Sequence, residues 1–238
     1  MNDNLVLISG ESATGKSASL KDLQNPAGIW YCNTESNKRL PFKSGFREFN
    51  IVDPLQIHEV FQRAEEDKDC HTIIIDSLTF LMDQFESIYV LPSANTMKAW
   101  GDFAQYFKTL MQAHVATSTK NVYFTAHTVG TLNENENVIE TKVPVKGSLK
   151  NNGIEAYFST VVSTKRVKIK DLANYSSPFL NITEEEEMLG FKYCFQTRLT
   201  KGTISERIRS PMGMWTVNET YIDNNVEFLN TRLAEYYS

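Results

Sequence analysis

Cysteine is scarce in this chain, and its few copies lie far apart. Cys32, Cys70 and Cys194 are the only cysteines among 238 residues, and none of them forms a Cys-x-x-Cys pair. A disulfide framework needs an even set of cysteines, and a structural zinc site needs closely spaced ligands. The pattern argues against both and favours a reducing compartment, where the three thiols are small buried apolar side chains.

Long apolar runs and an excess of positive charge are also missing. No segment approaches the roughly 18 consecutive apolar residues of a transmembrane helix, and Met1–Asn4 begins neither a basic nor an apolar leader. We therefore expect a cytoplasmic protein with no membrane association. The formal net charge of -5 excludes a globally basic nucleic-acid binder and leaves room only for a local basic face.

The chain also lacks an internal repeat and a linker rich in Pro, Gly or Ser. Its 41% apolar residues suffice for a full core, and 22% charged residues is ordinary for a soluble protein. A length of 238 residues fits one large domain. We therefore predict a single domain over residues 1–238.

Strand-like and helix-like segments alternate in the first half of the chain. The pattern predicts strands at 5–8, 29–32, 72–76 and 121–126, and helices at 16–23, 57–66 and 97–111. The strands are short apolar runs, and the last helix repeats apolar residues every three or four positions, which indicates a face packed on a sheet. This alternation predicts an α/β fold with a mostly parallel central sheet flanked by helices.

The second half has a different character. Residues 128–145 are polar and predict an irregular functional loop, whereas 158–169 and 192–199 predict strands, antiparallel toward the C-terminus. The acidic run at 184–187 indicates a solvated turn. Residues 217–238 are expected to close the chain as a helix.

A phosphate-binding pattern, Gly-x-x-x-x-Gly-Lys-Ser, follows the first predicted strand. Its residues are Gly10, Glu11, Ser12, Ala13, Thr14, Gly15, Lys16 and Ser17. The glycines let backbone N–H groups converge on phosphate oxygens, and the following helix adds the positive end of its dipole. Lys16 is expected to contact the β- and γ-phosphates, and Ser17 to bind Mg²⁺. The segment predicts a nucleoside triphosphate site, with ATP and Mg²⁺ as the expected occupants.

Three polar side chains follow other predicted strands. Asp76 ends the strand at 72–76 and is expected to hold Mg²⁺, directly or through water; the alternative is a cap of the next helix. Glu35 lies 19 residues after Lys16 and is a candidate to polarise the attacking water, or an ordinary loop glutamate. His127 is a candidate contact of the γ-phosphate, or a structural histidine.

These features, in this order, resemble the ATPase core of RecA-like recombinases. The matching pieces are Leu-Ile-Ser-Gly-Glu-Ser-Ala-Thr-Gly-Lys-Ser, Tyr-Cys-Asn-Thr-Glu, Ile-Ile-Ile-Asp-Ser-Leu and Tyr-Phe-Thr-Ala-His-Thr. The resemblance covers residues 5–215 and is closest to short phage-encoded recombinases that promote single-strand annealing. It implies a RecA-like fold, a catalytic role for Glu35 and Lys16, and host cytoplasm as the location of a phage-encoded protein.

The chain departs from the family pattern in two ways. RecA-like proteins usually carry a sensor glutamine at the position of His127. Their full-length members also have an N-terminal segment that docks on a neighbouring subunit, whereas the first strand here begins near residue 5. Filament formation is therefore left open.

The resemblance also implies a partner, single-stranded DNA. Residues 128–152 are similar to the second DNA-binding loop of the family and contain Lys142, Lys146 and Lys150, while residues 89–95 fall where the first such loop lies. Seven Lys or Arg residues and one acid occur between 142 and 170, a local surplus in an acidic chain. Phosphate contacts from this surplus predict sequence-independent, salt-sensitive binding; a solvated strand face is the alternative.

Arg207 and Arg209 are two apart in a predicted strand and so share a face. In RecA-like assemblies basic residues near this place reach the γ-phosphate of the neighbouring subunit, which implies a homo-oligomer with ATP at its subunit interfaces. The alternative is an exposed basic edge strand. A single-strand-binding protein is a further candidate partner.

Other functions compete with an ATP-dependent recombinase. A RecA-like helicase-related motor or loader of a replication complex shares the same core, and a nucleotide-dependent switch shares it without turnover. A small-molecule kinase needs an arginine-rich lid, for which there is no convincing candidate. An AAA-type ATPase needs a C-terminal helical lid domain, and the strand-rich stretch at 158–217 argues against it.

Overall fold

The computed structural model describes residues 2–134 and 137–238. Over these residues one sheet of eight strands has the order β10-β9-β8-β1-β5-β4-β2-β3. Its strands are β1 (Leu5–Gly10), β2 (Ile29–Asn33), β3 (Arg47–Asn50), β4 (Thr72–Asp76), β5 (Asn121–His127), β8 (Thr160–Lys168), β9 (Phe191–Gln196) and β10 (Tyr221–Asp223). β1, β2 and β4 are buried along their whole length, which explains their continuous apolar sequences.

The strand directions confirm the expected fold class. Parallel pairings join β3, β2, β4, β5, β1 and β8, while β9 is antiparallel to both β8 and β10. Gly10 is in register with His127, and Asn33 is in register with Asp76. Because parallel strands end at one edge of a sheet, these registers bring the strand ends that lead to Lys16, Glu35, Asp76 and His127 to the carboxyl edge.

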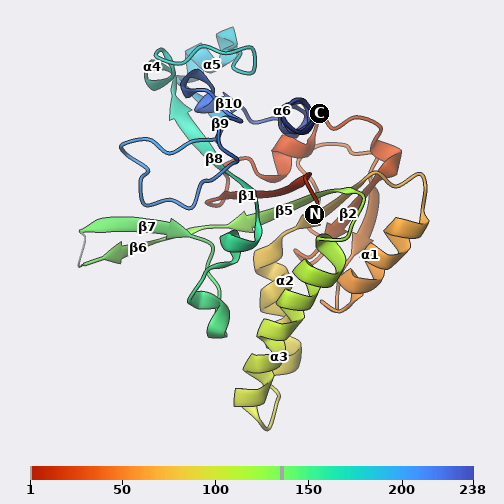
Figure 1. The fold of residues 1–238 in the computed structure, drawn as a ribbon. Helices are drawn as coiled ribbons and strands as arrows, with labels where there is room; N and C mark the ends of the chain where they lie inside the picture. The colour runs from red at the N-terminus through yellow and green to blue at the C-terminus, as the bar shows by residue number, and fades with distance from the viewer. Residues whose placement is uncertain (1, 135–136) are drawn as a thin grey trace.

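Three helices cover one face of the sheet (Figure 1). They are α1 (Gln56–Glu66), α2 (Leu78–Phe85), which continues as a π-helical turn at Glu86–Val90, and α3 (Thr96–Thr109), which continues at Leu110–Val115. Phe61, Phe103 and Phe107 pack with Phe124 of β5 in the core on this side. The apolar face predicted at 97–111 is therefore a core face.

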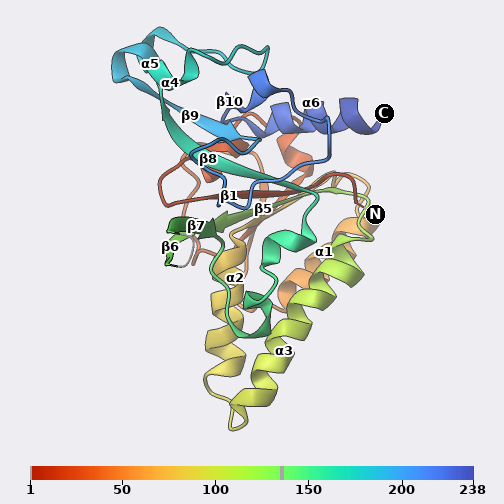
Figure 2. The same ribbon diagram turned by 60° about the vertical axis from the view of Figure 1, so that its left-hand side comes forward.

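The opposite face carries less helix (Figure 2). It is covered by a 3₁₀ helix, η1 (Ser17–Leu20), and by α6 (Val226–Tyr237). Leu20, Leu229 and Leu233 pack there with Trp215 and with Tyr123 of β5. The C-terminal helix thus lies beside the segment that follows the phosphate loop.

The remaining elements lie outside these two layers. A hairpin of β6 (Val129–Asn133) and β7 (Val138–Lys142) projects away from the sheet (Figure 1). The short helices are α4 (Ile169–Leu172), α5 (Glu184–Leu189), η2 (Pro26–Gly28), η5 (Gly147–Lys150), η6 (Ile154–Tyr157) and η7 (Val217–Glu219). Cys32, Cys70 and Cys194 are buried free thiols, as expected.

The helix predicted at 16–23 is wrong in kind and length. The structure has a single 3₁₀ turn, η1, of four residues. Ser19 donates from its hydroxyl to the carbonyl of Lys16 at 2.6 Å, a side-chain bond that competes with helical hydrogen bonding. A turn this short has a small dipole, so the phosphate site depends more on loop N–H groups and Lys16 than the sequence suggested.

Four further expectations for the second half need correction. Residues 128–145 form the β6–β7 hairpin, which suits their Val, Ile and Thr content; residues 135 and 136 lie outside the described residues. The acidic run at 184–187 begins α5, which a capping box of Thr183 and Glu186 stabilises. The terminal helix starts at Val226 because β10 occupies 221–223. Arg207 and Arg209 lie outside any strand, in a segment of isolated bridges.

Candidate active site

The phosphate loop at 10–17 is a tightly bounded turn between β1 and η1. Gly15 has φ +99°, which favours glycine, and Ala13 has φ 60°. A Cβ on Gly10 would collide with Thr164 Oγ1, so β8 leaves room only for a glycine there. The Thr14 hydroxyl lies 2.8 Å from the carbonyl of Glu11 and 2.6 Å from Thr164 Oγ1. Glu11, Ser12 and Ala13 are exposed at the tip of the loop.

The Lys16 ammonium lies inside this loop. It donates to the carbonyls of Gly10 at 2.9 Å and Glu11 at 2.7 Å, and only 6% of the residue is exposed. Burial lowers the pKa of Lys16 to about 8, with Asp76 and Glu35 acting against the shift. The ammonium therefore places a positive charge beside the backbone N–H groups of the loop. This combination of donors suits the binding of phosphate.

Asp76 has the surroundings expected of a magnesium ligand in a phosphate-loop protein. Its carboxylate accepts from Ser17 Oγ at 2.8 Å and from Tyr31 Oη at 2.7 Å, and also from Thr125 Oγ1. Mg²⁺ prefers oxygen ligands and usually keeps a carboxylate, waters and substrate oxygens rather than an all-protein cage. The Ser17–Asp76 pair therefore fits Mg²⁺, and the described residues contain no cluster of three or more His, Cys, Asp or Glu for another metal site.

Glu35 follows β2 and points toward the same edge. Thr34 fixes the backbone before it, since its hydroxyl donates to the carbonyl of Ser77 and accepts from the Ser77 N–H, both at 2.7 Å. The Glu35 carboxylate lies 3.3 Å from His127 Nε2 and 2.7 Å from Lys38 Nζ. The hydrogen bond from His127 has the largest effect on the pKa of Glu35, and that from Lys38 adds to it. Together they lower this pKa to about 2, although burial alone would raise it.

His127 joins the two charged groups of the site. Its Nδ1 lies 3.4 Å from Lys16 Nζ, and its Nε2 lies on the Glu35 side. A neutral imidazole with its proton on Nε2 satisfies both contacts, because it donates to the carboxylate and accepts from the ammonium. The Thr79 hydroxyl accepts from the His127 N–H at 2.9 Å, and Phe80 packs edge-on against the ring.

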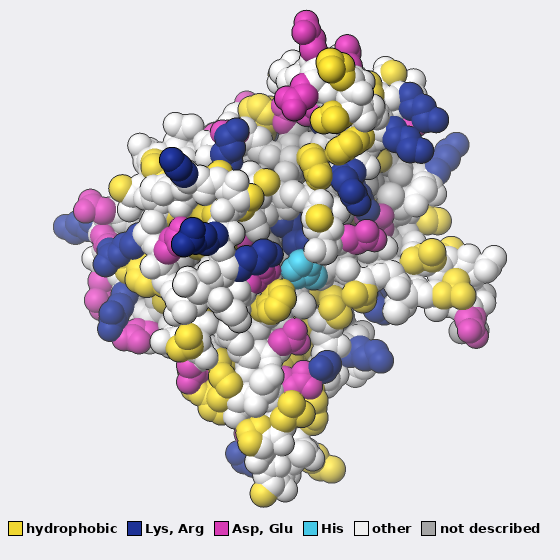
Figure 3. Space-filling model, turned by 180° about the vertical axis from the view of Figure 1, so that it is seen from behind, with side chains coloured by type: hydrophobic (Ala, Val, Ile, Leu, Met, Phe, Trp, Pro, Cys, Tyr) yellow, Lys and Arg dark blue, Asp and Glu magenta, His cyan; other side chains and the backbone are white. Residues whose placement is uncertain are grey.

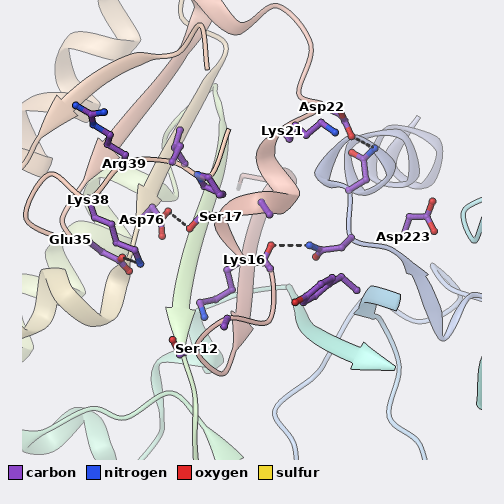
Figure 4. Close-up of a pocket in the computed structure, with 18 of the residues that line it drawn as sticks. Ser12, Lys16, Ser17, Lys21, Asp22, Glu35, Lys38, Arg39, Asp76 and Asp223 are labelled. Carbon is purple, nitrogen blue, oxygen red and sulfur yellow. Dashed lines mark hydrogen bonds and ion pairs between the residues drawn. The ribbon is translucent and has the colours of Figure 1, made fainter. Parts of the chain in front are cut away.

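These groups line a cavity of about 770 Å³. Glu35, Lys38 and Asp76 lie on one side of the phosphate loop, and Asp223 lies on the other (Figure 4). On the face drawn in Figure 3, basic, acidic and apolar side chains all lie close to a histidine near the middle.

Sequence reasoning missed several residues of this cavity. Tyr31, Lys38, Tyr193 and Asn224 all line it. Tyr31 lies one residue before the end of the strand predicted at 29–32. The alternation of side chains along a strand could have identified it as a residue that points toward the site. No local pattern marks Asn224, which meets the loop only through the fold.

The three lysines predicted to bind DNA differ in their surroundings. Lys142 on β7 is half-buried and lies 3.2 Å from Glu140. Lys146 is exposed and lies 2.5 Å from Glu86, in the turn after α2. Lys150, in η5, is exposed. Residues 89–95 form the tip of the α2–α3 hairpin, which projects away from the sheet (Figure 1).

Arg207 and Arg209 are exposed on either side of the buried Ile208, so they share a face although they are not in a strand. Neither lines the 770 Å³ cavity of its own chain. Arg207 is near the hairpin, because the adjacent Glu206 forms a bridge with Thr141 of β7. Hydrogen bonds from Asn133 and Lys142 lower the pKa of Glu140 on that strand, and the charge of Arg207 adds a smaller effect.

The phosphate loop, the Asp76 carboxylate at the end of β4 and the parallel sheet together define a P-loop ATPase core. A family model described as an AAA domain matches residues 2–190. That span is most of the chain, and the chain belongs to this family of nucleotide-binding ATPases. No curated protein matches the chain.

The family match corrects the sequence argument against an AAA-type ATPase. The observation behind that argument still holds, because β8, β9 and β10 extend the sheet after residue 158 and the described chain forms no separate helical lid domain there. None of the helices within 2–134 and 137–238 has both the length and the apolar character needed to cross a bilayer.

Proposed function

We propose that this chain is a RecA-like recombinase core that hydrolyses ATP, binds single-stranded DNA and promotes annealing or strand pairing. The observation that carries the proposal is the Lys16–His127–Glu35 contact chain at the end of β5. It links the phosphate-binding lysine to a carboxylate that suits a water-activating base. The same strand leads directly into the β6–β7 hairpin, the candidate DNA-binding element.

In the proposed reaction, the phosphate loop and Lys16 hold the triphosphate, and Ser17 and Asp76 hold Mg²⁺. Mg²⁺ held by these two residues would supply positive charge that offsets the negative charge of the triphosphate. Glu35 stays ionised at neutral pH because its pKa is about 2. It accepts a proton as water bonds to the γ-phosphorus and the bond to the ADP oxygen breaks. His127 and Lys38 hold this carboxylate in position.

His127 is suited to connect the nucleotide to the hairpin. Thr128 donates from its N–H to the carbonyl of Gly10 at 3.1 Å, and β6 begins at the next residue. A γ-phosphate that draws Lys16 away from His127 changes the hydrogen bonding at the base of the hairpin. This connection supports a coupling between ATP and DNA binding.

The DNA contacts proposed for Lys142, Lys146 and Lys150 are with phosphates and carry no sequence preference. Lys142 and Lys146 each pair with a carboxylate, of Glu140 and Glu86 respectively, and DNA phosphates would replace these partners with groups of the same charge sign. Binding of this kind falls steeply as salt is raised.

We further propose a homo-oligomer in which Arg207 and Arg209 complete the ATP site of a neighbouring subunit. Both guanidinium groups are exposed and outside their own cavity, so an action on ATP requires a second copy. Two guanidinium groups suit a γ-phosphate because each binds oxygen pairs.

The decisive experiment measures ATP turnover with and without single-stranded DNA, alongside annealing of complementary strands and the mass of the assembly. The recombinase predicts DNA-stimulated turnover and ATP-dependent annealing. Directional unwinding without annealing identifies the motor or loader. Tight ATP binding without turnover in either condition identifies the switch, and both of these results contradict the proposal.

A further inference from the structure

The family match ends at residue 190, yet residues beyond it help to build the nucleotide cavity. Asn224 follows β10, and its Nδ2 donates to the carbonyl of Gly15 at 2.8 Å. The contact is close, since a Cβ on Gly15 would lie 2.6 Å from the same nitrogen. The C-terminal segment therefore forms one wall of the phosphate loop.

The other end of the Asn224 amide is unsatisfied. Its Oδ1 is buried and has no hydrogen-bond donor among the described residues. A buried carbonyl oxygen without a donor is costly, and such atoms usually have a partner when the site is in use. Because Asn224 lines the cavity, an N–H or O–H group of a ligand is suited to be that partner.

An aromatic ring lies beside this amide. Tyr193 on β9 is 39% exposed and lines the same cavity. Its ring carbon Cδ1 comes within 3.4 Å of the position a Cβ would take on Gly15, and Phe191 packs edge-on against it at 5.6 Å. A supported, partly exposed ring next to a phosphate loop suits stacking with a planar base.

The charges at the two ends of the cavity differ. Lys16, Lys38 and Arg39 line the loop side. At the Tyr193 end, Lys192 is 6% exposed and pairs with Glu186 at 2.7 Å and Asp223 at 3.1 Å. Two carboxylates on one ammonium leave no surplus positive charge for a phosphate. This end fits an uncharged group.

We propose that the nucleoside half of the ligand binds at this C-terminal wall. Tyr193 stacks on the base, and Asn224 Oδ1 accepts an N–H or O–H from the base or the ribose. The inference rests on the proposed function, since it assumes that the loop holds a triphosphate. It assigns to residues outside the family match the task of distinguishing a nucleotide from a bare polyphosphate.

The test compares the affinities of the full chain for Mg-ATP and for Mg-tripolyphosphate by titration calorimetry. Tyr193→Ala should weaken ATP binding about 10-fold, within a range of about 5- to 100-fold for loss of a base stack. Its tripolyphosphate affinity should change less than about twofold, because the loop is intact. Tyr193→Phe should keep the wild-type ratio of the two affinities, as should Tyr237→Ala, a similarly exposed tyrosine on α6.

Asn224→Ala gives an independent reading if Tyr193→Ala does not fold. It should lower the ratio of ATP to tripolyphosphate affinity, although both affinities decrease when the bond to Gly15 is lost. Equal losses for the two ligands, or unchanged ATP binding in both variants, overturn the inference. A wild-type chain that binds neither ligand overturns the proposed function instead.

Discussion

The phosphate end of the molecule differs from its basic surface, by which we mean the exposed cations Lys146, Lys150, Arg207 and Arg209. At the phosphate end, Lys16, Glu35 and Asp76 are each held by two or more neighbours, and Lys16 and Asp76 are buried. On the basic surface, Lys150, Arg207 and Arg209 are exposed. The first region is organised within one chain, whereas the second offers charge to something outside it.

This difference indicates which residues act only together with a partner molecule. A preorganised site needs little rearrangement when charge develops in it, so single substitutions there should have large effects. Exposed ion pairs contribute little to stability, so a partner exchanges them at low cost, and single substitutions there should leave the stability of the lone chain nearly unchanged. The predictions below test that contrast.

Among substitutions at the phosphate end, Lys16→Ala should cause the largest loss of turnover. Without the ammonium, turnover should fall to the background rate, because the lost charge faces the phosphates. The fold should survive, since burial already disfavours the charged form of Lys16. Phosphate release and thermal melting measure the two effects, with Lys43→Ala as an exposed control. Unchanged turnover removes the basis of the ATPase assignment at this loop.

The double variant Arg207→Ala/Arg209→Ala tests the role of the two arginines on the basic surface. If both act on a neighbouring ATP, turnover should fall roughly 10³- to 10⁵-fold with ATP binding intact. Mixing this protein with Lys16→Ala protein should restore some turnover, because a mixed interface pairs an intact loop with intact arginines. Specific activity of the wild type should also rise with protein concentration.

Failure of the mixing experiment has a definite meaning when native mass spectrometry shows mixed assemblies. With no recovered turnover and no dependence on concentration, the two arginines are surface or DNA contacts, consistent with the bridge between Glu206 and Thr141 that brings Arg207 near the hairpin. The trans model is then wrong.

Glu35→Gln tests the water-activating role at the phosphate end. The amide keeps the shape and loses the base, so kcat should fall roughly 10²- to 10⁴-fold while ATP still binds. Glu48→Gln, an exposed carboxylate on β3, is the control. A decrease of less than about threefold assigns the base to another group.

Replacing Lys142, Lys146 and Lys150 by alanine should weaken single-stranded DNA binding for all sequences. The plot of log affinity against log salt should flatten by about two units if all three lysines contact phosphate. The matched control removes the same charge from Lys43, Lys68 and Lys108, which are exposed elsewhere. An equal flattening in both triple variants, or none, places the DNA on another surface.

The smallest expected effect is on stability at low pH. The folded-state pKa of Glu35 lies at about 2, below its ordinary 4.5, so its carboxylate stabilises the fold above about pH 4.5. That contribution is lost as pH falls toward 2 and is on the order of 1–3 kcal/mol. The difference in unfolding free energy between wild type and Glu35→Gln, from urea titrations, should therefore shrink between pH 7 and pH 2. A constant difference contradicts the low pKa.

Local patterns were sufficient for much of the phosphate end. The glycines of the loop, the apolar strands before Asp76 and His127, and the alternation with helices each depend on neighbours a few residues apart. Because parallel strands finish at one sheet edge, those strand ends converge without any knowledge of strand order. The capping signature at Thr183 and Glu186 was equally local and was overlooked.

The sequence alone determined the class of fold, the phosphate loop and the strand-end residues Asp76 and His127, since short-range periodicity and glycine geometry encode them. The tertiary structure alone decided that His127 joins Lys16 to Glu35, 111 and 92 residues away, and that Asn224 closes the loop from 209 residues away. Such contacts depend on which strands pair and on where the chain returns. Strand pairing and the path of the chain are decided when the whole core is buried, and no local segment of the sequence specifies them.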